Sequence, residues 1–438
     1  MIKMFRAVFV CLLCLYPFAS VLGAQKITLA ECERQALETS PMVKSAENEF
    51  KAAETAAEAF KTNLMPVLSL EGKAYYITAV PELDMYIPGL GQINKKLGDN
   101  LNYSGGLAVR WNLFDGNVQK SNYEAARKLA DSKKSILGYE KKKALMETRI
   151  AYFNLITAAA NLKLIDEQLE LTISQNRDIK RSVQLGAKSK LDEVMSDNEV
   201  LIKQKQKNAA RILLIETADN LNALTGNIID NYEIDLSAFD SPESLLQIFS
   251  KNIYAEFDDN NPQLLSFDML EQYYGLISKS YENMNFPRVN IFGTSAYDYP
   301  DGPNLKSVWQ NTAGADFYMP VYQFGRNPKM SKQYKFTAMS AENQRQGLYD
   351  DLKRLFNRSK EKAKILSSQI DLSKDIVTQS QTAADMTYQA YISGNSKYLD
   401  VQFMNLKVLE ARSSETDFYA GLLTELTILE ALKKCKRE

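Results

Sequence analysis

The sequence predicts a mixed α and β protein in which long helices alternate with short strands and the whole pattern occurs twice. Three observations indicate this. The 12 prolines among 438 residues are unevenly placed, so two long stretches contain none and can form very long helices. Four short segments alternate apolar and polar residues with a period of two, as strands with one polar face do. Both halves of the chain carry these features in the same order, which indicates a tandem internal duplication.

The composition limits the classes of function. The chain has no histidine, the commonest general base near neutral pH and the commonest metal ligand, so we expect no catalytic triad, no metal site and no cofactor. Its 53 basic residues nearly cancel 54 acidic ones, so no overall field attracts nucleic acid. A mean hydropathy of -0.32 does not fit several membrane helices, whereas it is compatible with membrane strands that have a polar lumen face.

Residues 1–24 are predicted to be a secretory signal peptide. Lys3 and Arg6 precede a short apolar run, and small residues near position 23 suit cleavage. A proline soon after the run disfavours the alternative of a buried helix. Two cysteines leave with the signal, and the remaining pair, Cys32 and Cys435, would form a disulfide only if the chain ends meet.

The first repeat is expected over residues 25–226, and its period changes in a fixed order. Residues from Thr28 to about Leu64 are rich in Ala, Glu and Lys, which favours helix, and after Pro66 apolar residues alternate, which favours strands. A stretch without proline then favours long helices joined by a turn at Gly186. The expected elements are a helix, a β-hairpin and two long helices, over residues 28–64, 67–114, 118–185 and 191–224. The helix 118–185 would be about 100 Å long at about 1.5 Å per residue.

The second repeat is expected over residues 261–432 and follows the same order. Its turn at Gly394 corresponds to the turn at Gly186 of the first repeat. The expected elements are a helix, a β-hairpin and two long helices, over residues 262–286, 288–324, 330–392 and 397–432.

The segments between these elements are expected to be irregular. Residues 80–100 and 299–311 separate the two strands of each hairpin and are rich in turn-forming residues, so both are expected to be loops. Residues 227–260 match neither helix nor strand well and are expected to form a small lateral linker between the repeats. Residues 433–438 form a C-terminal tail.

Short motifs in both halves resemble the TolC family of outer-membrane efflux channels. They are an opening segment that includes a Ser-Pro pair, an aromatic strand end, and a Gly-x4-Leu-Asp turn that occurs twice. In chain order these are Ile27 to Cys32 with Ala36-Leu37 and Ser40-Pro41, then Trp111 to Gly116, then the turns Gly186 to Asp192 and Gly394 to Asp400. Each motif alone is weak, whereas the ordered set covers essentially the whole mature chain.

The resemblance implies that several chains assemble into one barrel, and the small number of strands in one chain points to the same conclusion. Four amphipathic strands cannot close a barrel alone, and lipid does not tolerate unpaired backbone edges. The resemblance implies a homotrimer with a 12-stranded transmembrane β-barrel, four strands per chain, continued by a long periplasmic α-helical barrel. The implied function is a passive exit duct in the outer membrane of a Gram-negative bacterium. Its implied partners are a periplasmic adaptor protein, an inner-membrane transporter and outer-membrane lipid.

The turns at Gly186 and Gly394 lie farthest from the strands, and the resemblance places a periplasmic gate there. By motif position, Asp192 and Tyr391 match an interacting pair of the family, and Asp400 matches an aspartate of the pore constriction. Carboxylates repeated around a narrow pore would attract cations and repel one another. For each acidic residue taken alone, a solvated helix start or N-cap is the simpler interpretation.

The gate pattern also departs from the family. The position of a gate arginine carries Ser396 with Lys397 beside it, and Phe403 replaces a second constriction aspartate. We therefore expect a weaker or partly hydrophobic lock.

Aromatic residues of the strands are candidates for the girdles that mark the two membrane interfaces. They are Trp111, Tyr76, Tyr103, Tyr297, Trp309 and Tyr318.

Two other classes of protein remain as alternatives. A secreted coiled-coil structural or adhesin-like protein would explain the long helices but not four alternating strands in matched positions. An enzyme that uses two carboxylates, such as a glycosidase, would need a cleft, whereas the acidic residues are spread along helices. The sequence does not identify the exported substrate, which could be a drug, a metal ion, a peptide or a protein.

Overall fold

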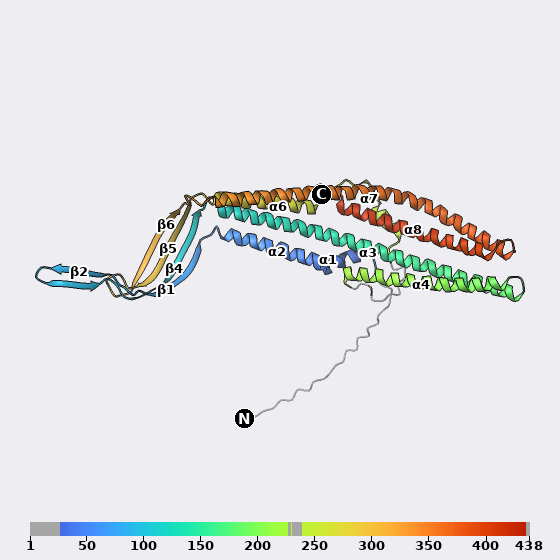
Figure 1. Cartoon of the computed structure of the whole chain (residues 1–438), viewed down its shortest axis with the longest axis horizontal. Helices are drawn as coiled ribbons and strands as arrows, with labels where there is room; N and C mark the ends of the chain where they lie inside the picture. The colour runs from blue at the N-terminus through green and yellow to red at the C-terminus, as the bar shows by residue number, and fades with distance from the viewer. Residues whose placement is uncertain (1–26, 227–228, 230–238, 435–438) are drawn as a thin grey trace, which may run out of the picture.

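The computed structural model describes residues 27–226, 229 and 239–434 and shows an elongated molecule. Strands lie at one end and two helical turns at the other, with long helices between them (Figure 1). The predicted signal peptide, most of the segment 227–238 and Cys435 lie outside the described residues. Within the described part, no helix is both long and apolar enough to cross a membrane.

In the described residues, the first half of the chain contains four helices and four strands. They are α1 (Leu29–Thr39), α2 (Pro41–Thr62), β1 (Val67–Tyr76), β2 (Glu82–Ile87), β3 (Gly91–Lys96), β4 (Leu101–Phe114), α3 (Val118–Gln184) and α4 (Lys190–Thr225). The second half has a similar order of long elements after two short helices. Its elements are α5 (Pro242–Phe249), the 3-10 helix η2 (Ser250–Tyr254), α6 (Pro262–Asn283), β5 (Arg288–Tyr299), β6 (Val308–Tyr318), α7 (Arg326–Ile392) and α8 (Tyr398–Leu432). The helices α3 and α7 each contain 67 residues.

The helix expected over residues 28–64 is two helices. Ser40 has φ -52° and ψ 118°, which breaks the helix, and its hydroxyl accepts a hydrogen bond from the Val43 amide. Pro41 occupies the first position of α2, where a missing N–H costs nothing. The Ser-Pro pair therefore ends one helix and starts the next.

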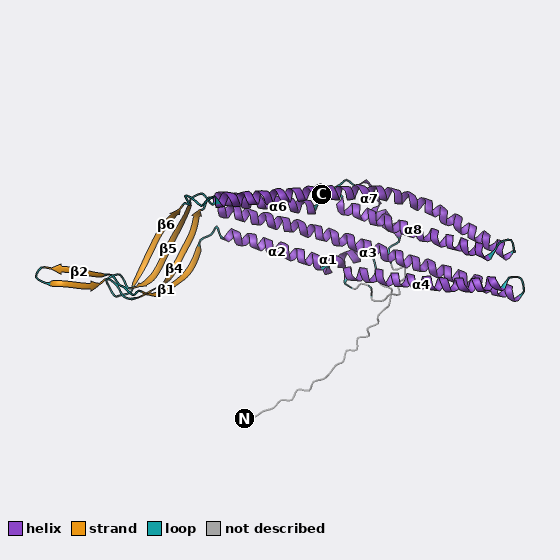
Figure 2. Ribbon diagram, in the orientation of Figure 1, coloured by secondary structure: helices purple, strands orange, loops and turns teal. Residues whose placement is uncertain are grey.

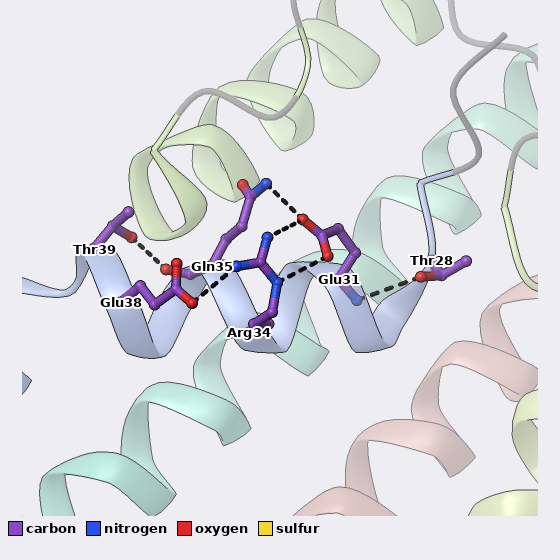
Figure 3. A network of polar contacts seen from close by, with 6 residues as sticks. All are labelled: Thr28, Glu31, Arg34, Gln35, Glu38 and Thr39. Carbon is purple, nitrogen blue, oxygen red and sulfur yellow. Dashed lines mark hydrogen bonds and ion pairs between the residues drawn. The ribbon is translucent and has the colours of Figure 1, made fainter. Parts of the chain in front are cut away.

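Figure 3 shows why the opening motif forms the short helix α1. The Thr28 hydroxyl caps it by accepting the Glu31 amide at 3.3 Å. On its exposed face Arg34 binds both Glu31 and Glu38, at 2.6 and 2.8 Å. Its opposite face buries three small or apolar side chains, those of Leu29, Cys32 and Ala36.

The loop expected over residues 80–100 was a wrong prediction in part, because it contains the hairpin of β2 and β3. Glu82 pairs with Lys96 and Ile87 with Gly91 in this two-stranded sheet. Gly89 and Gly91 have positive φ at its tip, so the residues read as loop formers supply a hairpin turn.

The second hairpin ends earlier than the expected residue 324. The strand β6 ends at Tyr318, because Pro320 follows and lacks the N–H that a strand ladder needs. The next helix begins at Arg326 rather than at residue 330, since Pro328 lies in its first turn, where no intrahelical N–H bond is required.

The four long strands form one antiparallel sheet in the order β1-β4-β5-β6, and their register aligns the apolar residues on one face. One row across this face contains Leu68, Val109, Gly293 and Ala313, and another contains Leu70 and Leu107 and continues through Ser295 and Asn311. The other face is polar, and Arg110 forms an ion pair with Glu71 across it. β1 and β6 are the edges of the sheet.

One glycine of the sheet has no room for a side chain. A Cβ added to Gly106 would lie 2.2 Å from the carbonyl oxygen of Ser295 on the neighbouring strand. Its neighbour Gly105 has nothing within 4 Å of the same position. β4 and β5 therefore approach each other closely at Gly106.

The helices form a single curved layer. Near the sheet its order is α2, α3, α6 and α7, and near the turns it is α4, α3, α8 and α7. The main apolar core lies midway along the layer, where α1, α3, α5 and α8 meet.

Arg149 holds this midpoint together by binding Glu33 at 2.5 Å and Glu430 at 3.0 Å. Its guanidinium also lies 5.1 Å from the centre of the Phe249 ring. Cys32 is buried in the same core and forms no disulfide within the described residues, and burial raises the pKa of its thiol to about 12. A disulfide with Cys435 concerns a residue outside the described part.

Candidate functional site

The two turns at the end of the helical layer have closely similar geometry. Gly186 in the α3–α4 turn has φ 76°, and Gly394 in the α7–α8 turn has φ 84°. Residues with a Cβ rarely adopt this left-handed conformation, so glycine is required at both positions. Figure 2 shows both turns at the end opposite the strands.

Each turn is followed by an aspartate that stabilises the start of the next helix. Asp192 accepts the Ser189 amide at 3.3 Å, while the Ser189 hydroxyl accepts the Asp192 amide at 3.1 Å. Asp400 accepts the Lys397 amide at 3.0 Å and the Ser396 hydroxyl at 2.8 Å. These bonds to the charged form hold the pKa of Asp400 below its usual value. Both predicted gate aspartates thus cap their helices.

Tyr391 is the centre of a buried cluster between the two turns. It is 2% exposed, and its ring centre lies 5.6 Å from that of Tyr398. Ile179 of α3 and Val401 of α8 complete the cluster. Burial, and then the negative charge of Asp192, raise the pKa of Tyr391 to about 12.

The predicted pair of Asp192 and Tyr391 is close in space but is not joined by a hydrogen bond. Within the described residues, the Tyr391 hydroxyl is buried without any hydrogen-bond partner. The residue that grips Tyr391 is Lys188, whose Nζ donates to the Tyr391 carbonyl oxygen at 2.5 Å and lies 4.0 Å from its ring centre. Lys188 therefore ties the α3–α4 turn to α7.

Sequence reasoning missed Lys188, although it lies in the turn Gly186-Ala187-Lys188-Ser189. The one sequence signal that could have identified Lys188 is its position two residues after the turn glycine. Of the other predicted gate residues, Phe403 is 56% exposed and contacts Lys407, whose Nζ lies 5.5 Å from the ring centre. Lys397 is exposed and contributes its backbone amide to the Asp400 cap. The structure does not bring these two residues to the Tyr391 cluster.

A ladder of polar contacts joins the two helical hairpins above the cluster. Each contact crosses between one hairpin, α3 and α4, and the other, α7 and α8. They are Tyr388 to Asp178 at 3.2 Å, Gln402 to Glu199 at 3.2 Å, Asn405 to Gln175 at 3.0 Å and Arg412 to Glu167 at 3.2 Å. Any motion that separates the hairpins must break these bonds.

Of the six predicted interface aromatics, five lie on the apolar face of the sheet. Tyr297 pairs with Trp309, and their ring centres are 6.3 Å apart. Tyr103 stacks on Tyr299 at 4.8 Å. Tyr76 lies at the same outer end of the sheet, whereas Trp111 lies at the end nearest the helices.

Tyr318 lies on the opposite, polar face of the sheet. It is paired with Arg288, and the residues beside it, Phe317 and Val289, occupy the apolar face. Along β6, Tyr318 alternates with the apolar residues and shares the polar face with Asp316. The aromatic side chain that β6 places on the apolar face at this end is therefore Phe317.

The described residues contain no group of three or more carboxylates or thiols that could hold a metal ion. The candidate site consists of the two turns, the buried Tyr391 cluster and the polar contacts between the helical hairpins.

Comparisons with known proteins point to one family. Residues 33–227 match the family model described as outer membrane efflux protein. Solved channels share the fold over 92% of this chain. The outer-membrane channel OprN is 15% identical over 89% of its length with a TM-score of 0.73. VceC of Vibrio cholerae is 15% identical over 95% with a TM-score of 0.73, and CmeC of Campylobacter jejuni is 15% identical over 85% with a TM-score of 0.72. No curated protein sequence matches the chain.

Proposed function

Because residues 33–227 match the model of the outer membrane efflux protein family, we propose that the chain belongs to this family and that three copies of it form one channel that a periplasmic adaptor and an inner-membrane transporter engage. The protein is an exit duct in the outer membrane, and its helical part lies in the periplasm. The channel is then a three-fold assembly with a twelve-stranded barrel, each chain supplies two repeats, and the gate lies at the turns of Gly186 and Gly394.

The open edges of the sheet carry the proposal. Among the residues that the structure describes, β1 and β6 each have one edge whose backbone N–H and C=O groups pair with no other strand. Each such group costs several kcal/mol in lipid, so neighbouring copies must pair β6 of one chain with β1 of the next. Small closed barrels contain about eight strands or more, which a single chain with four long strands cannot supply.

The helical layer has open edges of the same kind. Near the turns its outer helices are α4 and α7, and exposed apolar side chains follow each of them at helical spacing. On α4 these are Leu191, Val194, Leu201 and Ile212, and on α7 they are Ile365, Leu372, Ile376 and Met386. Stripes of this kind pack against another helix. Closing a ring buries α4 of one copy against α7 of the next.

The apolar face of the sheet has the height of a bilayer core. Tyr76 faces Leu101 at the outer end, and Trp111 lies at the inner end of the same strand pair. The separation of about ten residues corresponds to about 33 Å along the strand, or about 25 Å at a tilt of about 40°. The polar face, with Glu71 and Arg110, then lines the lumen.

The two turns of each copy form the gate. In the closed state Lys188 and the polar ladder hold the two helical hairpins of each copy together, and the turns of the copies converge around the axis. Opening separates the hairpins, breaks the Lys188 contacts and widens the end of the tunnel. The duct itself performs no covalent chemistry, so energy for export comes from the transporter.

Purified mature protein in planar bilayers tests the proposal. We expect discrete conducting steps from a species that migrates as a trimer before heating and as a monomer afterwards. A protein that is extracted without detergent, remains monomeric and never conducts would contradict the proposal and would favour a soluble coiled-coil rod.

A further inference from the structure

A groove at the junction of sheet and helices has no role in the channel described above. It lies where β4 passes into α3, beside the end of α6. A hollow of about 430 Å³ is lined there by Phe114, Phe286, Lys120, Lys279 and Glu124. It continues along α3 and α6 into a second hollow of about 590 Å³ that Arg127 and Lys128 also line. Pockets for small ligands have volumes of this order.

The register of the strands shows on which side of the protein the groove opens. A bulge between Asn112 and Phe114 shifts the pairing, so Phe114 faces Val289. Val289 pairs in turn with Phe317, which is 69% exposed on the apolar face. Phe114 thus belongs to the lowest aromatic row of the apolar face and also forms the upper rim of the groove. The groove therefore continues the surface that contacts lipid under the proposed function.

The close fit of the junction fixes the base of the groove. Gly116, with φ 71°, connects β4 to α3, and a Cβ there would lie 2.7 Å from Phe286 and 2.8 Å from the Asn283 carbonyl oxygen. The end of α6 can therefore approach the start of α3. Lys120 and Lys279, one from each helix, then line the same hollow.

The charge of the groove is positive. Lys120, Arg127, Lys128 and Lys279 outnumber the acidic residues of the two hollows, which are Glu124 and Asp131. Within the described residues none of these four cations has an ion-pair partner within 4.0 Å. Lys120 lies in the first turn of α3 and Lys279 in the last turn and a half of α6, within about 6 Å of the helix ends at about 1.5 Å per residue. Headgroups occupy this depth beside the hydrocarbon core.

We propose that this groove binds the headgroup of an anionic phospholipid of the inner leaflet of the outer membrane. The acyl chains would lie on the row of Phe114 and Phe317, while Lys120 and Lys279 reach the phosphate and Arg127 and Lys128 contact the rest of the headgroup. Basic pockets at this depth bind anionic headgroups in membrane proteins, and long cationic side chains extend readily to the interface. The inference rests on the proposed function, because it requires the apolar face to contact lipid.

The chain offers an optical probe for this site. It contains two tryptophans, Trp111 and Trp309, at opposite ends of the apolar face. In a Trp309→Phe background, whose channel formation is checked by conductance, all tryptophan fluorescence comes from Trp111, one row above the groove. Vesicles that contain brominated phosphatidylglycerol or brominated phosphatidylcholine then report which lipid lies next to Trp111.

We expect brominated phosphatidylglycerol to quench Trp111 with a relative binding constant about five-fold to thirty-fold above that of phosphatidylcholine, since two lysines contact the headgroup. The double variant Lys120→Gln and Lys279→Gln should lose this preference, while Lys120→Arg with Lys279→Arg keeps it. The control Lys163→Gln and Lys205→Gln removes two exposed lysines from the helices far from the groove and should keep it as well.

Three results separate the possible failures. Equal quenching by both lipids, or a preference that survives in the Lys120→Gln and Lys279→Gln variant, would overturn the lipid site and leave the channel intact. Quenching by neither lipid would overturn the lipid-facing sheet and with it the proposed function. A preference that is also lost in the Lys163→Gln and Lys205→Gln control would show a general charge effect and would overturn the site.

Discussion

Replacing Lys188 with methionine should open the channel. Methionine keeps most of the length of the side chain but removes the charge that holds the Tyr391 carbonyl oxygen and lies over the Tyr391 ring. The contact joins the α3–α4 turn to α7, so its loss weakens the link between the two helical hairpins in every copy.

The magnitude follows from the two contacts. A hydrogen bond from a charged donor contributes about 1.5–3 kcal/mol, and a cation over an aromatic ring contributes about 0.5–1 kcal/mol at a partly exposed site. Because Lys188 is half-buried and water replaces part of the loss, we take about 2 kcal/mol per copy. This shifts the balance between closed and open about 30-fold per copy. If three copies open together, the total is about 6 kcal/mol.

Single-channel recording in planar bilayers measures this shift as the fraction of time spent open. Lys190→Met is the matched control, because it removes the same charge from the same turn. Lys190 is 74% exposed and binds only Glu193 of its own helix at 2.8 Å within the described residues, a contact that contributes little. Equal open fractions in the two variants would refute the assignment of Lys188 as the link.

The same assay separates Lys188 from the Tyr391 hydroxyl. That hydroxyl is buried without a partner in the described chain, so Tyr391→Phe should change the open fraction by less than about two-fold. Tyr391→Ala should open the channel strongly, since it leaves a cavity that costs about 3–5 kcal/mol. An open Tyr391→Phe channel would show that a hydroxyl bond, rather than ring packing, closes the gate.

Three further predictions concern other parts of the molecule. Gly106→Ala forces a Cβ against the neighbouring strand and should abolish the heat-modifiable trimer on a gel. Gly105→Ala, which has open space at its Cβ, should assemble normally. Equal assembly of the two variants would contradict the close approach of β4 and β5. Arg149→Met leaves two glutamates facing an apolar core and should reduce the free energy of unfolding, measured in thermal melts, by about 2–4 kcal/mol. A loss below about 1 kcal/mol would show that the core does not need Arg149. The pKa of Asp400 is lowered in the folded chain, so its cap is fully present above pH 3.8 and is lost as the pH falls through the lower folded value. The protection factors of the amides at the start of α8, which correct for the intrinsic pH dependence of exchange, should therefore be unchanged from pH 7 to 5, and lower protection factors in that range would be against the cap.

Much of the architecture follows from local sequence signals, because the long elements obey strong periodicities. The uneven prolines located the hairpins, and the helices α3 and α7 begin where the aromatic strands end. The break at Ser40 was missed, since the composition of residues 28–64 is helical on both sides of it. The hairpin of β2 and β3 was missed because its short strands are surrounded by the glycines that form its turn.

The candidate site was less accessible from sequence. Gly186 and Gly394 were found because a left-handed turn requires glycine. The Lys188 contact was not, because it joins residues about 200 positions apart and depends on how α3 and α7 come together. Tyr318 was assigned by residue type alone, although its place in the alternation of β6 indicates the polar face.

The mass of the assembly tests the central claim most directly, because the open edges of sheet and helix layer require neighbouring copies. Native mass spectrometry of the mature protein released from detergent measures the number of chains without cross-linking. The account predicts a complex of three chains, and none of the single chain at concentrations that conduct in bilayers. A stable single chain that forms pores would contradict it, because β1 and β6 would then have found another way to satisfy their backbone groups in lipid.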